Sequence, residues 1–421
     1  MIKNYWTKHL LTTSLTVFTL LFYLPSHSQI IQWDNCGKFL GNISQGSNNS
    51  DWTQYWNQVT PENGGKWGSV ERERDVMNWT DLDKAYKLAK DNGLLFKQHV
   101  FAWGNQQPSW IETLTEEEQL AEIEEWIMAY CERYPDTDFI EVVNEPINDP
   151  PFGSTNGNYA NALGGRGDTG YDWIIKAFEL AKEHCPNAAL MINEYNLLNS
   201  ENNRYDYSKI IGLLTERELI DAVGAQGHAF TVKDMTAEDM TTAINDLAKH
   251  GLPVYITELD IDGPGENTQL EKYKEIFPAI WEHPSVAGVT LWGYRQGTMW
   301  REDAYIMNSN GTERSALTWL KDYITPYNSV CEGYDPPLNT GFNTKATLIY
   351  PNPISNGSLH VQSDKAIEKL TIRNISGQKM LEYRPHQLTQ KIELEIDLPA
   401  GLYLVKIEGP SLSEERRLVI K

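Results

Sequence analysis

Two glutamates, Glu145 and Glu258, each lie at the end of a short apolar segment, in the strings VVNEP (142–146) and ITELD (256–260). Two carboxyl groups that face each other can hydrolyse a glycosidic bond. One carboxyl with a raised pKa protonates the leaving oxygen, and the other attacks the anomeric carbon as an anion. We therefore interpret Glu145 and Glu258 as a catalytic pair, provided that the fold brings them together.

Further polar and aromatic side chains follow other apolar, β-branched segments of the chain. Amides there can hydrogen-bond sugar hydroxyls or hold a glutamate, and indole rings can stack on the apolar faces of pyranose rings. His228 can contact the sugar or support a neighbouring side chain, and we leave Asp260 out of the site as the brace of a loop. The candidate substrate-binding residues are Glu62, Asn63, Lys66, His99, Trp103, Asn144, Tyr195, Gln226, His228, Trp292 and Trp300.

These candidate residues can form one site only if the strands that precede them are parallel and their C-terminal ends meet. Strand-like segments alternate with amphipathic helical ones, which predicts an α/β fold, a (β/α)8 TIM barrel whose βα loops form the active face. An open doubly wound sheet is the competing topology, although no glycine-rich nucleotide fingerprint follows the first strand. The eight expected strands are Phe39–Ile43, Gln58–Glu62, Leu94–Trp103, Phe139–Asn144, Ala188–Asn193, Ala222–Gln226, Val254–Leu259 and Val286–Trp292.

Helical periodicity fills most of the intervals between these strands. Thr80 is a suitable N-cap for the first long helix, and the glutamates after Thr115 suit a helix N-terminus. The first βα unit is the weakest, because Asp51–Trp56 offers only a short helix. The expected helices are Asp81–Asn92, Thr115–Tyr134, Tyr171–His184, Tyr205–Glu218, Ala237–His250, Gln269–Glu282 and Ser315–Tyr323.

The character of the chain changes after residue 330. Glycine, proline and asparagine are frequent at 331–343, which indicates a linker over 331–344 between a catalytic domain at 29–330 and a second domain at 345–421. The second domain is expected to be a small all-β sandwich. Its expected strands are Ala346–Tyr350, Ser358–Val361, Ile367–Asn374, Gln378–Tyr383, Gln390–Leu398, Gly401–Glu408 and Glu415–Ile420.

Residues 1–28 have the pattern of a secretory signal peptide, with two lysines, the apolar stretch Leu10–Leu24 and small residues before Gln29. We therefore expect an extracellular or cell-surface protein without a transmembrane span in the mature chain, and a monomer. The formal net charge of −22 argues against binding to nucleic acid or to an anionic membrane, and fits a neutral substrate.

Four cysteines allow three pairings in an exported chain. Cys131 and Cys185 each fall near the end of an expected helix, so we favour the pairs Cys131–Cys185 and Cys36–Cys331. The spacing of the cysteines matches no zinc site, and we expect neither a metal nor a cofactor.

The strings around the two glutamates closely resemble glycoside hydrolase family ten, the endo-β-1,4-xylanases. The resemblance implies hydrolysis of xylan with retention, with Glu145 as acid/base and Glu258 as nucleophile. It also implies that Glu62, Asn63 and Lys66 bind sugar on the non-reducing side. The matching segments are VTPENGGKW, KQHVFAWGNQQPSW, MINEYN, GAQGH and LWGYRQGTMWR.

The sequence departs from this family at several positions. Gly104 stands where the family has a second histidine, Gly64 and Gly65 replace larger residues, and Glu194 replaces an aspartate. Tyr294 and Arg295 alter the loop after the eighth strand. These changes leave open a retaining glycosidase that acts on a decorated or different β-glycan. A non-catalytic glycan-binding protein is a further alternative.

The C-terminal domain resembles the type A sorting domain of the type nine secretion system. The segments LIYPNPISNGSL, LTIRNISGQKM and LPAGLYLVKIEG carry this resemblance. It implies export by that secretion machinery, followed by removal of the domain. A carbohydrate-binding module is the alternative, but the lack of tryptophan after residue 319 favours sorting.

Overall fold

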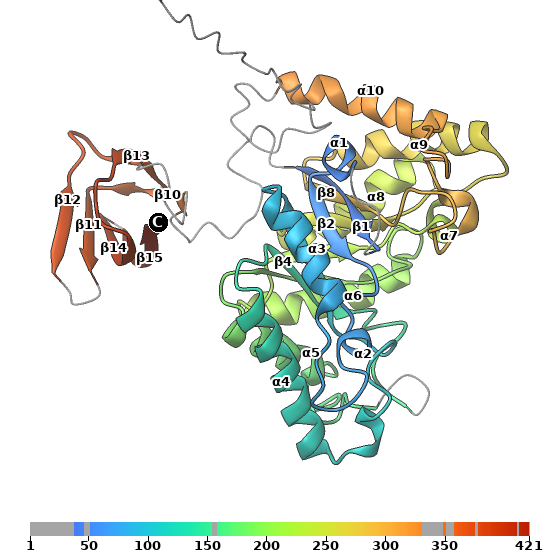
Figure 1. Ribbon diagram of the computed structural model, residues 1–421, viewed down its shortest axis with the longest axis horizontal. Coiled ribbons are helices and arrows are strands. Elements are labelled where there is room, and N and C mark those ends of the chain that lie inside the picture. Colours follow the sequence, from blue (N-terminus) through green and yellow to red (C-terminus); the bar gives the residue numbers. More distant parts are fainter. Residues whose placement is uncertain are drawn as a thin grey trace, which may run out of the picture.

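The computed structural model describes residues 38–45, 51–153, 158–330, 348–350, 358–374, 378–410 and 412–420. Eight parallel strands form a closed barrel in sequence order, because β1 pairs with both β2 and β8 (Figure 1). Closure confirms the TIM barrel and excludes the open sheet. The strands are β1 Phe39–Ser44, β2 Gln58–Pro61, β3 Leu95–Ala102, β4 Phe139–Asn144, β5 Ala189–Asn193, β6 Ala222–Ala225, β7 Val254–Leu259 and β8 Val286–Leu291.

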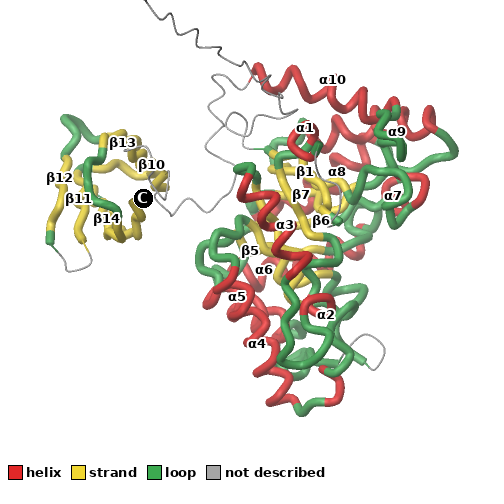
Figure 2. Tube along the Cα trace, viewed as in Figure 1, coloured by secondary structure: helices red, strands yellow, loops and turns green. Residues whose placement is uncertain are grey.

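Helices surround the barrel, as the colours of Figure 2 make plain. The first βα unit contains only the single turn α1, in line with the weak helical signal there. The α-helices are α1 Trp52–Tyr55, α2 Trp67–Val70, α3 Thr80–Asp91, α4 Glu116–Arg133, α5 Asp172–His184, α6 Glu201–Glu216, α7 Ala229–Val232, α8 Ala237–Leu247, α9 Glu266–Trp281 and α10 Ser315–Val330.

The structure agrees with one predicted helix start and corrects two others. Thr115 caps α4 in a reciprocal capping box with Glu118. The expected start of α6 at Tyr205 was wrong, because the Ser200 hydroxyl accepts a hydrogen bond from the Asn203 amide and starts the helix at Glu201. Thr80 is the first residue of α3 rather than its cap.

The two ends of the barrel differ in chemistry. At the N-terminal end, the rings of Phe39, Phe139 and Tyr255 pack inside the barrel, with centroids 5.3–5.7 Å apart. Met191, Ala222 and Ala287 complete this apolar cluster. The C-terminal halves of the same strands carry buried polar and charged residues instead. Apolar packing therefore fixes one end of the barrel and leaves the other for the site.

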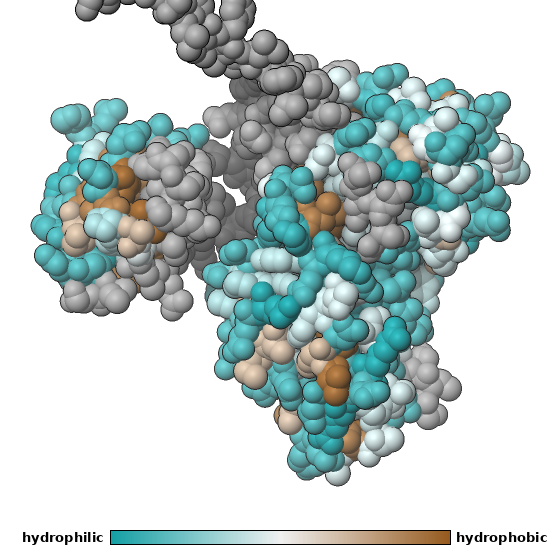
Figure 3. Space-filling view, viewed as in Figure 1, coloured by the Kyte–Doolittle hydropathy of each residue, from teal (hydrophilic) through white to brown (hydrophobic). Residues whose placement is uncertain are grey.

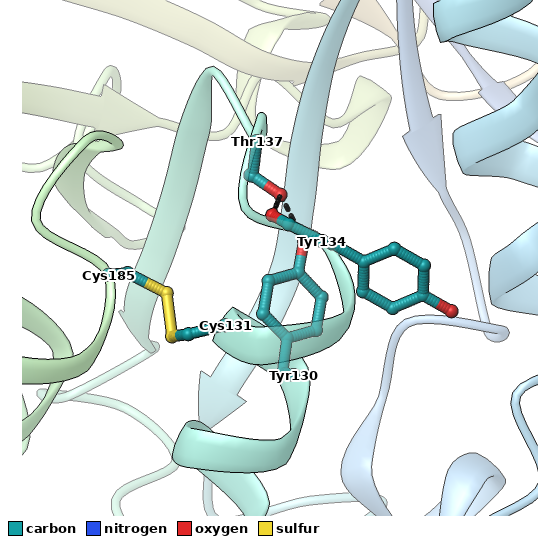
Figure 4. Close-up of a disulfide and its surroundings, with 5 residues drawn as sticks. All are labelled: Tyr130, Cys131, Tyr134, Thr137 and Cys185. Atoms are coloured by element: carbon teal, nitrogen blue, oxygen red, sulfur yellow. Dashed lines mark hydrogen bonds between the residues drawn. A yellow bond between two sulfur atoms is a disulfide. The ribbon is translucent and has the colours of Figure 1, made fainter. Parts of the chain in front are cut away.

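A disulfide joins the last turn of α4 to the residue after α5 (Figure 4). It links Cys131 to Cys185, which confirms this predicted pair. Beside it, the Tyr130 hydroxyl and Thr137 Oγ1 lie 2.9 Å apart, which ties α4 to the turn before β4. The other predicted pair, Cys36–Cys331, lies outside the described residues.

The C-terminal domain consists of two antiparallel sheets, in the orders β13-β10-β9 and β12-β11-β14-β15, around a shared apolar core. This arrangement confirms the all-β prediction. The expected end of the second strand at Val361 was wrong, because β10 continues past an irregularity in its pairing. The strands are β9 Leu348–Tyr350, β10 Ser358–Ile367, β11 Lys369–Asn374, β12 Lys379–Tyr383, β13 Thr389–Glu395, β14 Gly401–Gly409 and β15 Leu412–Ile420.

The face of the barrel seen in Figure 3 is largely hydrophilic, with small apolar spots. Among the described residues, no helix has the length and apolar character needed to cross a membrane. The predicted signal peptide and linker lie outside the described residues, so the domain boundaries remain predictions.

Candidate active site

The two glutamates are connected by amides at the C-terminal ends of the strands. Asn193, the last residue of β5, donates from Nδ2 to Glu258 Oε1 (2.8 Å) and to Asn144 Oδ1 (2.9 Å). Gln226 donates to the same oxygen of Asn144 (3.2 Å) and to Glu145 Oε1 (2.9 Å). The structure thus brings both predicted catalytic residues and the predicted amides Asn144 and Gln226 into one network, to which it adds Asn193.

Glu145 lies in an environment that favours its neutral form. Burial raises its pKa to about 8, and the nearby charges of Glu258 and Glu194 add to this effect. The hydrogen bonds from Gln226 and from Trp103 Nε1 (2.8 Å) oppose the rise without cancelling it. At neutral pH the Glu145 carboxyl group therefore holds a proton that it can donate.

Glu258 has the opposite protonation state. Its burial alone would raise the pKa, but the hydrogen bond from His228 and the positive charges of His99, His228 and Lys97 lower the pKa to about 2. Oε2 lies 3.1 Å from His228 Nε2, and Oε1 accepts from Asn193. Glu258 is therefore an anion held by donors on both oxygens, which suits a nucleophile or an electrostatic stabiliser.

His228 and Asp260 form a pair behind Glu258. Burial would lower the pKa of His228, but hydrogen bonds to Asp260 and Glu258 outweigh it and raise the pKa to about 10. Asp260 lies 2.8 Å from His228 Nδ1 and accepts a 2.8 Å hydrogen bond from Trp300 Nε1. Asp260, which the sequence analysis left out of the site, thus orients two site residues from a position two residues after Glu258.

A second charged group lies inside the barrel and includes the predicted site residue His99. Lys97 Nζ donates to Glu141 Oε1 (2.5 Å), and His99 Nδ1 lies 2.6 Å from Glu141 Oε2. All three side chains are buried. The sequence analysis missed Lys97 and Glu141, although charged residues at alternate positions of apolar strands were a usable signal.

The donor atoms of His99, Glu141 and Glu258 lie close enough together to hold a metal ion, within 4.8 Å of one another. The ammonium group of Lys97 already contacts Glu141 and also donates to the Thr257 carbonyl (3.2 Å). The ammonium group of Lys97 therefore already balances the charge of one of these carboxylates.

The predicted sugar-binding residue Lys66 lies between Asn63 and Trp103. Lys66 Nζ donates to Asn63 Oδ1 (2.9 Å) and lies 5.2 Å from the centre of the Trp103 ring. Burial lowers the pKa of Lys66, against the charges of Glu258, Glu62 and Glu145. These groups form a polar subsite on the β2–β3 side of the two glutamates.

Aromatic rings surround His228. The His228 ring lies 4.7 Å from Trp300 and 6.2 Å from Trp292, both edge-on. Trp300 is 49% exposed, whereas Trp292 is buried. Phe230, which the sequence analysis missed, is 39% exposed, and its ring lies 6.2 Å from that of Tyr195 and 6.4 Å from that of Trp300. Phe230 therefore adds a second exposed ring to the cluster around His228 and Trp300.

The loop after β4 lies against Gly104. The Gly104 amide donates to the Asp149 carbonyl (3.0 Å), and a Cβ at position 104 would lie 2.3 Å from that oxygen. A histidine does not fit here, so glycine at this position reflects a close approach of two loops. Asp149 in turn accepts a hydrogen bond from the Tyr195 hydroxyl (3.3 Å).

Glu194 fixes the same loop from β5. Its carboxyl group accepts hydrogen bonds from the amides of Ile147 (2.9 Å) and Tyr195 (2.7 Å) and from the Asn148 side chain (2.9 Å). The longer side chain at this departure from the family pattern therefore organises the loop that follows Glu145.

The other departures have structural roles. Gly65 packs against β3, since a Cβ there would lie 2.5 Å from the His99 carbonyl. Arg295 forms an ion pair with Asp51, and the Tyr294 ring packs edge-on against Trp56 (5.3 Å). These contacts hold the loop after β8 against α1.

Two known families account for most of the chain. Residues 34–323 match glycosyl hydrolase family 10, and residues 348–421 match the secretion system C-terminal sorting domain. The second match confirms the predicted nature of the C-terminal domain and indicates secretion by the type nine system.

Individual relatives agree with the first match. Endo-1,4-beta-xylanase B of Cellvibrio japonicus is 44% identical over 286 residues, which cover 67% of this chain and 45% of the relative, so the chain spans less than half of that protein. Endo-1,4-beta-xylanase A of Humicola insolens is 30% identical over 275 residues, which cover 63% of this chain and 70% of the relative. The solved structure of xylanase 10B from Thermotoga maritima has the same fold, with a TM-score of 0.60 and 23% sequence identity. The similarity covers 70% of this chain and 97% of that structure. This chain belongs to glycosyl hydrolase family 10.

Proposed function

We propose that this protein is a secreted, retaining endo-β-1,4-xylanase in which Glu145 is the acid/base and Glu258 the nucleophile. The observation that carries the proposal is the opposite protonation of two glutamates in one hydrogen-bonded network, with pKa values of about 8 and about 2. The relatives from Cellvibrio and Humicola, both called endo-1,4-beta-xylanases, support xylan as the substrate.

In the first step, Glu258 attacks the anomeric carbon while Glu145 protonates the leaving glycosidic oxygen. The bond to the leaving sugar breaks and an ester bond to Glu258 forms. This ester removes the negative charge of Glu258, which had helped to raise the pKa of Glu145. Glu145, now ionised, takes a proton from water in the second step, and the hydroxide attacks the anomeric carbon and releases Glu258.

The surrounding groups keep these roles apart. His228, positioned by Asp260, stabilises the Glu258 anion before attack and after release. Asn193 holds the other oxygen of Glu258, and Gln226 orients Glu145. The polar subsite at Lys66 and the exposed ring of Trp300 provide hydrogen bonds and a stacking surface for a neutral sugar chain.

The stereochemical outcome tests the mechanism. Proton NMR of fresh xylo-oligosaccharide digests should show the β-anomer as the first product. A 2-deoxy-2-fluoro glycoside should add one sugar mass to the peptide that contains Glu258. First appearance of the α-anomer, or labelling of another residue, would refute the retaining assignment.

A second candidate keeps this mechanism but changes the glycan to a decorated or mixed-linkage xylan. The close contact between Gly104 and the loop at Asp149 favours it, because this contact replaces a sugar-binding histidine expected from the family. Initial rates on linear xylan, glucuronoxylan, arabinoxylan and mixed-linkage xylan would separate the candidates. Binding without turnover on every substrate would instead favour a glycan-binding protein.

We further propose that the type nine machinery recognises residues 348–421, that the domain is then removed, and that the released enzyme is a monomer. Mass spectrometry of the secreted enzyme should place its C-terminus before β9. Light scattering of that product should give the mass of one copy.

A further inference from the structure

Three acidic side chains meet outside the network of the two glutamates, between the segment that follows α2 and the helix α4. Glu71, Asp75 and Glu122 each offer a carboxylate oxygen, and these oxygens lie within 4.8 Å of one another. Glu71 is only 1% exposed and Glu122 only 5% exposed, whereas Asp75 faces solvent. Two carboxylates of the group are therefore buried, while the third is accessible to solvent.

Glu71 organises the turn that presents Asp75. Glu71 Oε2 accepts a 2.8 Å hydrogen bond from Trp67 Nε1, and Oε1 accepts a 2.9 Å hydrogen bond from the Asp75 amide. Asp75 itself has a positive φ of 64°, a conformation that aspartate tolerates better than most residues. The turn is thus fixed by its own carboxylate with Asp75 at its tip.

Glu122 supplies an independent sign that a ligand belongs here. Its Oε1 accepts a 2.6 Å hydrogen bond from Arg74 Nε. Its Oε2 is buried and has no hydrogen-bond partner among the described residues. An unpaired buried carboxylate oxygen is costly, and a bound cation would remove this cost.

The local charge is also unbalanced. Burial raises the pKa of Glu71, and the charges of Glu122 and Glu125 raise it further against its two hydrogen bonds. Burial likewise raises the pKa of Glu125, with added contributions from Glu122 and Asp75, while Arg74 opposes them. The guanidinium group of Arg74 already pairs with Glu122 and Glu118, and the carboxylates of Glu71, Asp75 and Glu125 lie in the same part of the described structure, which favours an additional positive charge.

We propose that Glu71, Asp75 and Glu122 bind a calcium ion. All three ligands are carboxylates, which suits a hard cation and disfavours zinc or copper, for which nitrogen or sulfur ligands are typical. Oxygens within 4.8 Å of one another are no farther apart than two ligands on opposite sides of a Ca²⁺ ion with bonds of about 2.4 Å. Solvent on the Asp75 side completes the coordination.

The ion connects the β2–α3 segment to α4. Trp67, whose indole holds Glu71, follows directly after Lys66 of the polar subsite. Calcium bound to the native state therefore stabilises the protein and fixes the base of the segment that carries this subsite.

Terbium luminescence tests the proposal on the full chain after treatment with EDTA and desalting. Tb³⁺ replaces Ca²⁺ at oxygen sites, and Trp67 is close enough to Glu71 to sensitise its emission. We expect saturable emission that added CaCl₂ displaces, and a higher unfolding temperature with CaCl₂ than with MgCl₂. Asp75→Asn should weaken Tb³⁺ binding about tenfold or more, because it removes an anionic ligand.

Asp234→Asn is the matched control, because its side chain is 88% exposed and lies outside the cluster, and it should leave emission unchanged. Glu122→Gln should abolish emission; if it does not fold, the exposed Asp75 variant still decides the question. Emission that is absent from the unsubstituted protein, or equal in the Asp75 and Asp234 variants, would overturn the proposal. A proton shared within the cluster would give that negative result, together with higher stability at acid pH.

Discussion

The indole nitrogen of Trp103 donates a 2.8 Å hydrogen bond to Glu145 Oε2. A donor favours the ionised carboxylate and keeps the pKa of Glu145 from rising above about 8. The same tryptophan faces Lys66, with the ammonium group 5.2 Å from the ring centre. Trp103 therefore couples the proposed acid to the polar subsite at Lys66.

The pH profile should follow these two pKa values. Activity requires neutral Glu145 and ionised Glu258, so kcat/KM should fall above about pH 8 and hold at acid pH until Glu258 titrates or the protein unfolds. Trp103→Phe removes the donor, so we expect the alkaline limb to move upward by about one pH unit. A limb that stays in place would contradict the role of this bond.

The roles of the two glutamates can be separated by leaving group. Glu145→Gln should lower turnover of xylan roughly 10²–10⁴-fold. It should have a much smaller effect on the glycosylation step with an aryl xyloside, whose leaving group needs no proton. Glu258→Gln should reduce this step strongly with both substrates. Equal losses for both variants on both substrates would contradict the assignment.

Phe230 should contribute binding energy for longer substrates. Phe230→Ala removes an exposed ring next to Tyr195 and Trp300, so KM for long xylo-oligosaccharides should rise roughly 2- to 10-fold with kcat nearly unchanged. Met128→Ala on the outer helix α4 is the control, because Met128 is equally exposed, at 39%. Equal KM values for the two variants would exclude Phe230 from the binding surface.

Gly104 should tolerate no side chain. Gly104→Ala places a Cβ 2.3 Å from the Asp149 carbonyl, so we expect the free energy of unfolding to fall by about 1–3 kcal/mol. Gly212→Ala within α6 is the matched control, because its Cβ would meet only the edge of His250, at 3.6 Å. The control should be neutral or stabilising in chemical denaturation, since alanine favours a helix.

The disulfide should affect stability without affecting chemistry. It closes a separation of 54 residues on the outside of the barrel. Replacing both Cys131 and Cys185 by alanine should lower the free energy of unfolding by roughly 2–4 kcal/mol. The folded variant should retain its kcat, and a large loss of kcat would mean that the link also positions the site.

The sequence predicted the barrel well because each apolar strand ends where the polar site residues begin, so that the end of the strand is marked in the sequence. Each strand expected to deliver a polar residue ends within two residues of the predicted position. Local patterns also located the capped start of α4. The start of α6 was missed because Ser200 lies in a polar stretch in which several residues could cap a helix.

The site was predicted only in part, since contacts across the barrel leave little trace in a local pattern. Asn193 sits in an apolar strand and bridges Asn144 and Glu258 from two other strands. Lys97 and Glu141 are 44 positions apart in the chain and meet only when β3 and β4 pair. The sequence showed Asp260 two residues after Glu258 but did not reveal its role, which depends on its hydrogen bonds with His228 and Trp300.

The packed rings of Phe39, Phe139 and Tyr255 give the barrel an apolar base. β4 starts at Phe139 and runs into Glu145, and β7 carries Tyr255 three residues before Glu258. Each of these two strands is thus anchored at its start by apolar packing, while its other end carries a buried carboxyl group, which is costly to bury. Changes in the loops at the C-terminal end of the barrel can therefore alter which sugars bind, while the packing that anchors both glutamates stays the same.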